Sequence, residues 1–493
     1  MTILSKDKIK KESLFIFITF LVFLIISPIL LKESPLKTLM IFLSLVSWSG
    51  LFIYTKDILF SSLLYILLVL PFNITLQFHS FVEIFNTKVL LAQPFVEGIY
   101  VNYLVPTASI LDVGILLSLV GILVTKGFSF YKTLFKDFKN GIFPLLLFLF
   151  IQNIFLFNFN SLLFSLRFFS LILLFLSVLQ ITKEEKLDKT IKEKIMTSGI
   201  VILFVNVLIQ GILGIIQFKR GSSLGLGFLG ESQVVSGMVG SSFVELSGQV
   251  FLRAYGTFPH PNVLGGFLLM AMFLGICMYN RRKLAGSLLI VISFLSMIFT
   301  FSRISILLGV VVILVLLLKE FLFKKKSLLS FSLSPLLLLE RFGNLLNGGD
   351  RSWSERLDLM KSSFRVIKEN WLFGAGGGNF VKGMEGFVPR GSSGILLTQP
   401  VHNIFLLCIS EFGVLGFLLI FYVLFYGVIK NIRRISLYGI LILFVIVVIG
   451  VFDHYLFSLP QGMVIFFSLL FLLSSSLGGE KGREAQFEYI KNK

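Results

Sequence analysis

The stretch PVHNIFLLCISEFGVLGFLLIFYVLFYGVI occupies residues 400–429. From Asn403 onward it is long and apolar enough for a membrane-spanning helix, which needs roughly 20 residues to cross a hydrocarbon core about 30 Å thick. The stretch closes the longest polar segment of the chain, so His402 lies where a loop meets the start of this span. The stretch therefore predicts a membrane protein with one titratable imidazole at the membrane surface.

The composition extends this conclusion to the whole chain. Of its 493 residues, 56% are hydrophobic and only 14% are charged, and its mean hydropathy is +0.93. Soluble domains average about 25% charged residues, so the chain is expected to be an integral membrane protein. Cys277 and Cys408 both lie in apolar runs and offer neither a disulfide framework nor metal-ligand spacing. With four histidines and few acidic clusters, neither a metal nor a cofactor is expected.

Apolar runs predict an all-α fold, a polytopic transmembrane helical bundle of about 14 spans (12–14). The run at 14–31 follows a basic N-terminus but is too long for a signal peptide, so we interpret it as an uncleaved first span. The run at 327–339 is short and contains Pro335, which makes it the weakest candidate. The candidate spans are 14–31, 36–54, 58–72, 109–125, 142–157, 161–181, 196–217, 261–279, 284–300, 304–319, 327–339, 403–429, 437–452 and 462–476.

Lysine and arginine determine the expected orientation, because they concentrate in cytoplasmic loops. Alternate connections are densely basic, and counting fourteen spans places these connections on one side together with both termini. We therefore expect a multi-pass protein of the cytoplasmic (inner) membrane with cytoplasmic N- and C-termini. The net charge of +18 then reflects this orientation and attraction to membrane lipid, with no nucleic-acid partner. The basic connections are 1–13, 126–139, 183–194, 281–283, 324–326, 430–434 and the tail from 481.

The three long loops, 73–108, 218–260 and 340–402, are expected outside the cytoplasm. The cytoplasmic loops are about 15 residues or shorter and carry no G-x-x-x-x-G-K-[ST] motif, which excludes a nucleotide-binding domain. Chemistry is therefore expected on the extracytoplasmic face, where nucleoside triphosphates are normally absent. A covalent reaction on this face requires a substrate that carries its own activation.

Two arginines lie close to expected span starts on that face. Arg253 precedes Gly256-Thr-Phe-Pro-His-Pro-Asn262, in which Thr257 or Asn262 are candidate helix caps. Arg303 follows Ser302 between two apolar runs that are joined by almost no loop. An arginine near the hydrocarbon edge usually points into protein or a wet cavity. The structural alternatives are a snorkelling side chain or an ion pair, and they apply equally to Arg167, about two turns into the span at 161–181.

His402 is the candidate with the most informative context. A single histidine at a helix start is more often a structural hydrogen-bonding group than a catalyst, and that alternative stays open on the residue alone. His454, within Asp453-His454-Tyr455, is expected on the same face, whereas His79 and His260 are less specific. The spans at 261–279, 304–319 and 403–429 all present N-termini outward, where free N–H groups and the helix dipole favour anions such as phosphate.

The segment before His402 predicts an amphipathic helix of about 17 residues. Its apolar positions recur at spacings of four and three, and Arg356 lies on its polar flank. Either this helix lies on the membrane surface or it forms a lid over the site. The following Gly374-Ala-Gly-Gly-Gly-Asn379 favours a flexible hinge or a helix stop, because no strand precedes it as a dinucleotide loop would require. The apolar positions are Trp353, Leu357, Met360, Phe364 and Ile367.

Together these residues resemble the O-antigen ligase and polymerase superfamily, the Wzy/WaaL-type membrane glycosyltransferases. Three features carry the resemblance: Arg253 with Gly-Thr-Phe-Pro-His-Pro-Asn, the Ser302-Arg303 pair, and His402-Asn403 followed by Gly413 and Gly416. The last feature is similar to the family pattern H-[NSQ]-x9-G-x-x-[GTY] in both spacing and residue type. The similar region covers about 195–430.

The resemblance implies four regions. These are an N-terminal transmembrane region (1–195), a catalytic core with external loops 218–260 and 340–402 (196–436), C-terminal transmembrane helices (437–476) and a cytoplasmic tail (477–493).

The resemblance also implies transfer of a saccharide from a polyprenyl (undecaprenyl) diphosphate carrier to an acceptor, with inversion and without metal. Arg253 and Arg303, with Arg356 as a third cation, would bind the diphosphate, and His402 would be the general base. Arg167, Asn403 and His454 are secondary candidates. The acceptor is a glycan, a lipid or a protein, which leaves polymerase, ligase and oligosaccharyltransferase open. The alternative function is a lipid-linked glycan flippase, which fourteen spans and an intramembrane Arg167 would also allow.

Overall fold

The computed structural model describes residues 6–78, 81–84, 87–90, 94–156, 158–184, 189–238, 240–246, 248–279, 282–324, 351–391 and 394–476. The expected span at 327–339, the expected tail at 477–493 and His79 lie outside these residues. The helices are α1 (Lys6–Glu33), α2 (Pro35–Thr55), α3 (Ile58–Val69), α4 (Ile110–Lys126), α5 (Phe128–Asp137), α6 (Lys139–Leu156), α7 (Phe159–Glu184), α8 (Lys189–Arg220), α9 (Pro261–Tyr279), α10 (Lys283–Ile298), α11 (Arg303–Lys324), α13 (Arg351–Glu369), α14 (Phe380–Gly383), α15 (Ile404–Lys430), α16 (Leu437–Phe452), α17 (Tyr455–Ser458) and α18 (Pro460–Ser475).

Strands occur only as short antiparallel pairs in the part of the chain that the structure describes. The pairs are β1 (Thr75–Gln77) with β6 (Thr107–Ser109), β2 (Phe81–Ile84) with β3 (Thr87–Leu90), β4 (Phe95–Val96) with β5 (Ile99–Tyr100), and β7 (Phe243–Leu246) with β8 (Gln249–Leu252). All of them belong to loops expected outside the cytoplasm.

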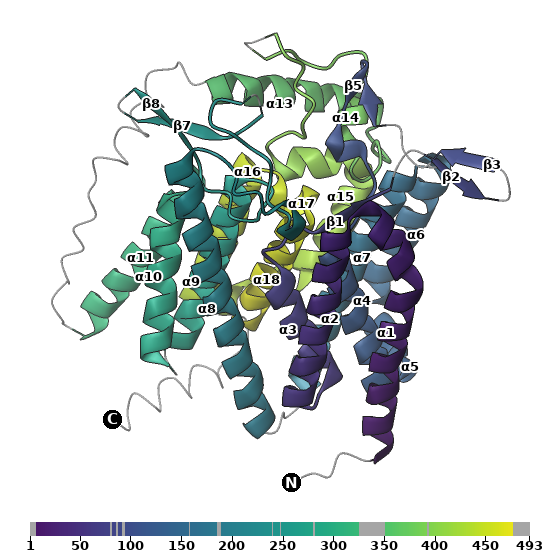
Figure 1. Cartoon of the computed structure of the whole chain (residues 1–493), viewed down its shortest axis with the longest axis vertical. Coiled ribbons are helices and arrows are strands. Elements are labelled where there is room, and N and C mark those ends of the chain that lie inside the picture. Colours follow the sequence, from purple (N-terminus) through teal and green to yellow (C-terminus); the bar gives the residue numbers. More distant parts are fainter. Residues whose placement is uncertain are drawn as a thin grey trace.

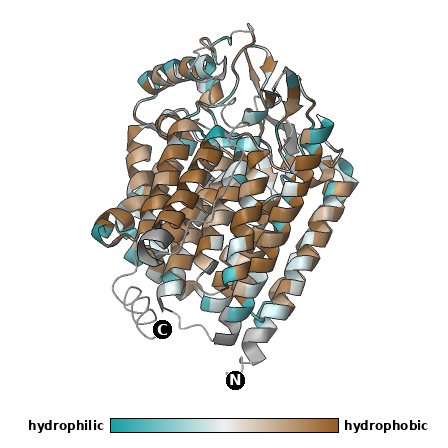
Figure 2. Cartoon of the chain, turned by 90° about the vertical axis from the view of Figure 1, so that its left-hand side faces the viewer, coloured by the Kyte–Doolittle hydropathy of each residue, from teal (hydrophilic) through white to brown (hydrophobic). Residues whose placement is uncertain are grey.

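Seven of the described helices, α1, α2, α6, α7, α8, α9 and α15, are long and apolar enough to cross a membrane. The bent pair α4–α5 brings that number to at most eight, and α3, α10, α11, α16 and α18 are shorter apolar helices. Figure 2 shows hydrophobic residues dominating the sides of the bundle. The chain is therefore an α-helical polytopic membrane protein, and its exact number of spans stays an expectation.

One helix appears where the sequence analysis expected only a basic loop. The chain bends by 106° after α4 and continues as α5, whose Leu134 is fully buried. Gly127 allows the bend because its φ of 75° lies in the left-handed region, which glycine enters without steric cost. The lysines of this segment obscured its apolar face.

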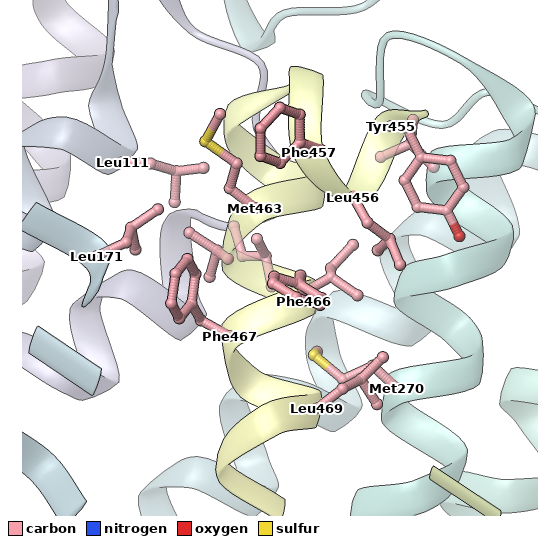
Figure 3. Packing of buried hydrophobic residues seen from close by; sticks show 14 of the residues in the cluster. Leu111, Leu171, Met270, Tyr455, Leu456, Phe457, Met463, Phe466, Phe467 and Leu469 are labelled. Atoms are coloured by element: carbon pink, nitrogen blue, oxygen red, sulfur yellow. The ribbon is translucent and has the colours of Figure 1, made fainter. Parts of the chain in front are cut away.

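Helix α9 lies inside the bundle and has buried residues on all sides, as expected for a core helix. It packs mainly on α10, with α18, α11 and α8 as further neighbours. Figure 3 shows the neighbouring part of the core, where Phe467 of α18 lies on the side of Leu171 of α7, and Leu469 of α18 lies beside Met270 of α9. This packing fixes the start of α9, which carries residues of the candidate site.

The external segments gather at one end of the bundle. Figure 1 shows α13, α14 and the β7–β8 hairpin at the end opposite the start of α1. The expected amphipathic helix is present as α13, but Trp353 and Phe364 of its apolar stripe are 50% and 58% exposed, while Leu359 and Val366 are buried. The helix therefore packs on the protein with a face adjacent to the predicted stripe.

Helix α15 breaks at Gly413, whereas the sequence predicted one continuous span. Gly413 has φ 66° and ψ 179°, and a Cβ atom at this position would collide with the Leu372 carbonyl group. The break frees two helical carbonyl groups: Ser410 accepts from the Ala375 N–H (2.9 Å) and Glu411 from the Gly376 N–H (2.8 Å). The glycine-rich segment, for which the sequence left a flexible hinge or a helix stop open, is thus hydrogen-bonded to α15.

Candidate functional site

The candidate site lies where the starts of α9, α11 and α15 meet the break between α16 and α17. Asn403 is the N-cap of α15, and its Oδ1 accepts from the Leu406 N–H at 3.0 Å. This cap fixes the backbone beside His402. Asn403, one of the secondary candidates, therefore has a structural role. At the start of α9 the cap is provided by His260 Nδ1, which accepts from the Asn262 N–H at 3.1 Å. The expectation that Thr257 or Asn262 caps α9 is therefore wrong.

A chain of polar contacts connects Arg253 to His402. Arg253 donates from Nη2 to Asn262 Oδ1 (2.7 Å), and Asn262 donates from Nδ2 to Asp453 Oδ2 (2.6 Å). Asp453 Oδ1 then lies 3.6 Å from His402 Nδ1, which is too long for a hydrogen bond but close enough for a strong charge interaction. An arginine and an imidazole that are 149 positions apart in the sequence are thus linked by two intervening side chains.

Asp453 is a buried carboxylate among positive or protonatable groups. Burial raises its pKa, but His402, His454 and the Arg356 guanidinium together lower that pKa well below its usual range. Asp453 therefore stays ionised at neutral pH and can stabilise an imidazolium at His402. In the sequence, Asp453 stands out only as the neighbour of His454.

The two imidazoles of the site differ in their surroundings. Their ring centroids lie 5.0 Å apart. His454 is 5% exposed, and its Nδ1 is 2.6 Å from Ser458 Oγ, whereas the His402 side chain is 17% exposed. Burial and the charges of His402 and Arg356, only partly opposed by Asp453, lower the pKa of His454 to about 3. His402 is therefore the more accessible of the two imidazoles, and His454 is the more buried one and is neutral at physiological pH.

Arg303 is the first residue of α11, and the structure brings the start of this helix against Arg253. The Arg253 Nε donates to the Thr300 carbonyl oxygen at 2.7 Å, in the short link between α10 and Arg303. This link is tight, because Phe301 has φ 47° and Ser302 N donates to Thr300 Oγ1. Two of the three predicted diphosphate ligands therefore lie on elements in direct contact.

Arg356 reaches the same region from α13. Its Nη1 donates to the Phe452 carbonyl oxygen (3.1 Å), one residue before Asp453, and its charge lowers the pKa values of Asp453 and His454. Helix α13 is thus attached to the end of α16, which agrees with the alternative of a cover over the site. The third predicted cation lies beside the imidazole pair.

Arg167 takes no part in this chain of contacts. It forms a bidentate ion pair with Asp112, with Nε–Oδ1 at 2.6 Å and Nη2–Oδ2 at 2.7 Å, and it donates to the Thr107 carbonyl oxygen. The structural ion pair considered for this residue from the sequence is therefore present. Arg167 instead lines a separate cavity near His454.

His260 also belongs to the site, although the sequence analysis ranked it low. Its Nε2 is 2.8 Å from Ser242 Oγ, and its Nδ1 caps α9. Burial and the charge of Arg253 lower its pKa to about 3, so it is neutral at physiological pH. The sequence contains a signal for His260, because this residue lies in the same short motif as Arg253 and Asn262.

Among the described residues, one group has the composition of a metal site. The candidate ligand atoms of His402, Asp453 and His454 all lie within 4.8 Å of one another. The charge of Arg356 acts on both Asp453 and His454, which disfavours a cation between them.

Comparison with known proteins identifies the middle of the chain. Residues 263–421 match the sequence profile of the O-antigen ligase family. The matched range contains Arg303, Arg356 and His402, begins one residue after Asn262, and ends before Asp453. No curated protein sequence matches the chain significantly.

Proposed function

We propose, because residues 263–421 match the O-antigen ligase family, that the chain is a membrane glycosyltransferase of the O-antigen ligase and polymerase superfamily that acts in surface polysaccharide biosynthesis. It transfers a saccharide from a polyprenyl diphosphate carrier to an acceptor on the extracytoplasmic face. The observation that carries this proposal is the contact chain from Arg253 through Asn262 and Asp453 to His402. This chain of contacts joins Arg253, a cation suited to the diphosphate leaving group, to His402, a base suited to the acceptor hydroxyl.

The diphosphate is the leaving group, and negative charge grows on it as the glycosidic bond breaks. Arg253 and Arg303 bind it at the starts of α9 and α11, with Arg356 as a third cation. Guanidinium groups bind phosphate oxygens in a bidentate manner and stabilise the transition state more than the ground state. Fixed cations of this kind supply the charge stabilisation that a metal ion supplies in other enzymes, so the proposed reaction needs no metal.

His402 acts on the acceptor. Its Nδ1 faces Asp453 at 3.6 Å, so Nε2 is the nitrogen that takes the proton from the acceptor hydroxyl. The acceptor oxygen forms a bond to the anomeric carbon while the bond to the diphosphate breaks, and the configuration inverts in this single step. Asp453 stabilises the resulting imidazolium.

A lipid-linked glycan flippase is the other function that the sequence left open. Such a protein moves its substrate without making a bond, and it has no need for a base held by a carboxylate next to a phosphate site. The O-antigen ligase match also does not favour it.

A transfer assay with the purified protein tests the proposal. The protein is placed in lipid nanodiscs with a synthetic polyprenyl diphosphate glycan and an acceptor, and products are identified by mass spectrometry and NMR. We expect a new glycosidic bond of inverted configuration, formed at the same rate with and without EDTA. Movement of the donor across a vesicle membrane with no new bond would support the flippase instead.

A further inference from the structure

A cavity of about 120 Å³ lies next to the candidate site, on the side of His454. Its wall comes from both halves of the chain: Tyr103 and Asn160 from the N-terminal half, and Pro400, Glu411 and Ser458 from the C-terminal half. Because a water molecule needs at least about 10–15 Å³ of such volume, the cavity has room for several water-sized groups. This is enough for one edge of a sugar ring with its hydroxyl groups.

The cavity contains a buried carboxyl group with an unused oxygen atom. Glu411 is 3% exposed, and its Oε1 accepts from the Phe380 N–H at 3.3 Å. Its Oε2 has no hydrogen-bond partner in the part of the chain that the structure describes. A buried polar atom without a partner is costly, and native proteins keep such atoms mainly where a ligand or function uses them. Arg167, which also lines the cavity, is already paired with Asp112.

Two contacts connect this cavity to the proposed base. Ser458 lines the cavity and is hydrogen-bonded to His454 Nδ1 at 2.6 Å, and the Tyr103 ring packs edge-on against the His454 ring at 6.1 Å. The His454 ring is 5.0 Å from that of His402. The cavity is thus connected to His402 through His454. Arg253 is connected to His402 through Asn262 and Asp453.

The side chains of the cavity match the chemistry of a sugar. The Glu411 carboxyl group, an amide, a phenol and a serine hydroxyl offer donors and acceptors for vicinal hydroxyl groups, and the tyrosine adds an apolar face. A phosphate is disfavoured by the Glu411 carboxyl group, because its free oxygen can only repel an anion or offer a single donor. We propose that this cavity is the acceptor subsite and that it binds the hydroxyl-bearing edge of a saccharide. This inference rests on the proposed glycosyl transfer, and it selects a glycan as the group that is glycosylated.

Saturation-transfer NMR with methyl glycosides tests the inference without requiring catalysis. The probes are the methyl glycosides of glucose, galactose, mannose and N-acetylglucosamine, added to the protein in nanodiscs because glycoside detergents would compete. We expect at least one probe to bind the wild type. Glu411→Gln, which replaces the carboxyl group by an amide, and Leu163→Phe, which enlarges another side chain of the cavity wall, should each raise its Kd at least about tenfold.

Three comparisons make the test decisive. Glu385→Gln removes a half-exposed carboxylate that is paired with Lys382 and should leave binding unchanged. His402→Ala should also keep the probe bound, so that loss of transfer and loss of acceptor binding are separated. Failure of every probe to bind the wild type, or equal binding to the wild type and to folded Leu163→Phe, would overturn the subsite. Binding of inorganic phosphate that Leu163→Phe abolishes but Arg303→Lys leaves intact would place an anion in the cavity and do the same.

Discussion

Asp453 Oδ1 lies 3.6 Å from His402 Nδ1, while the other oxygen of the same carboxylate accepts a hydrogen bond from Asn262 at 2.6 Å. One buried carboxylate therefore contacts the proposed base and, through Asn262, the proposed diphosphate ligand Arg253. A group in this position orients the imidazole and stabilises its protonated form. It also couples the geometry of the acceptor side to that of the donor side.

Replacing Asp453 tests this role. Asp453→Asn keeps the shape and a hydrogen-bonding group but removes the charge, so the imidazolium loses its counter-ion. We expect kcat for glycan transfer to fall about 100-fold, the lower end of what a positioned general base contributes. The matched control is Asp358→Asn, which changes an acidic residue that pairs with exposed Lys361 on α13. An unchanged pH–rate profile in Asp453→Asn would show that the carboxylate does not act on the base.

Arg303→Lys distinguishes a diphosphate ligand from a structural arginine. Lysine keeps the charge but cannot make bidentate contacts with phosphate oxygens. Loss of one charge-assisted hydrogen bond costs about 1.5–3 kcal/mol, which corresponds to roughly a 10- to 100-fold fall in kcat/KM. Arg390→Lys, at an exposed loop position, serves as the control. Wild-type turnover in Arg303→Lys would assign this arginine to structure alone.

The stability of the protein should depend on pH through its buried histidines. The pKa values of His260 and His454 fall from 6.5 to about 3 in the folded state. Between about pH 3 and pH 6.5 these two histidines bind protons in the unfolded chain but not in the folded chain. Their contribution to the free energy of unfolding is therefore complete above about pH 6.5 and decreases as the pH falls. The apparent Tm in nanodiscs should therefore drop between pH 7 and pH 5. His454→Gln should remove about half of this slope, and a wild-type slope in that variant would contradict the assignment.

Gly413 is expected to be irreplaceable for structural reasons. Gly413→Ala puts a Cβ atom into the Leu372 carbonyl group at a backbone conformation reserved for glycine, which costs at least about 1–3 kcal/mol. The apparent Tm should fall accordingly. Gly427 of the same helix has open space around it, so Gly427→Ala should be neutral or stabilise by up to about 1 kcal/mol. Equal Tm values for the two variants would show that the break at Gly413 is not required.

The sequence predicted those features that depend on local pattern. Hydropathy located the span-length and the shorter apolar helices, because each is an apolar run between polar segments, and the spacing of apolar residues located α13. Helix α5 was missed because its lysines obscure its apolar face, and the break in α15 was missed because a glycine in an apolar run does not reveal its dihedral angles. Both depend on contacts with distant segments.

The site was predictable only in part for the same reason. Arg253, Arg303 and His402 stand in short motifs next to span starts, which is a signal in one sequence. The contact between Asn262 and Asp453 joins residues 191 positions apart, and the ion pair of Arg167 joins residues 55 positions apart. No spacing rule connects such pairs, so packing of the helices was needed to find them.

The central claim is that His402 is the base that activates the acceptor. Its most direct test measures donor binding and glycan transfer on the same preparation of His402→Ala in nanodiscs. We predict that kcat falls by about 10²- to 10⁴-fold while the Kd of the lipid-linked donor stays within about threefold of the wild type. Transfer at a near wild-type rate by a correctly inserted His402→Ala protein would contradict the account.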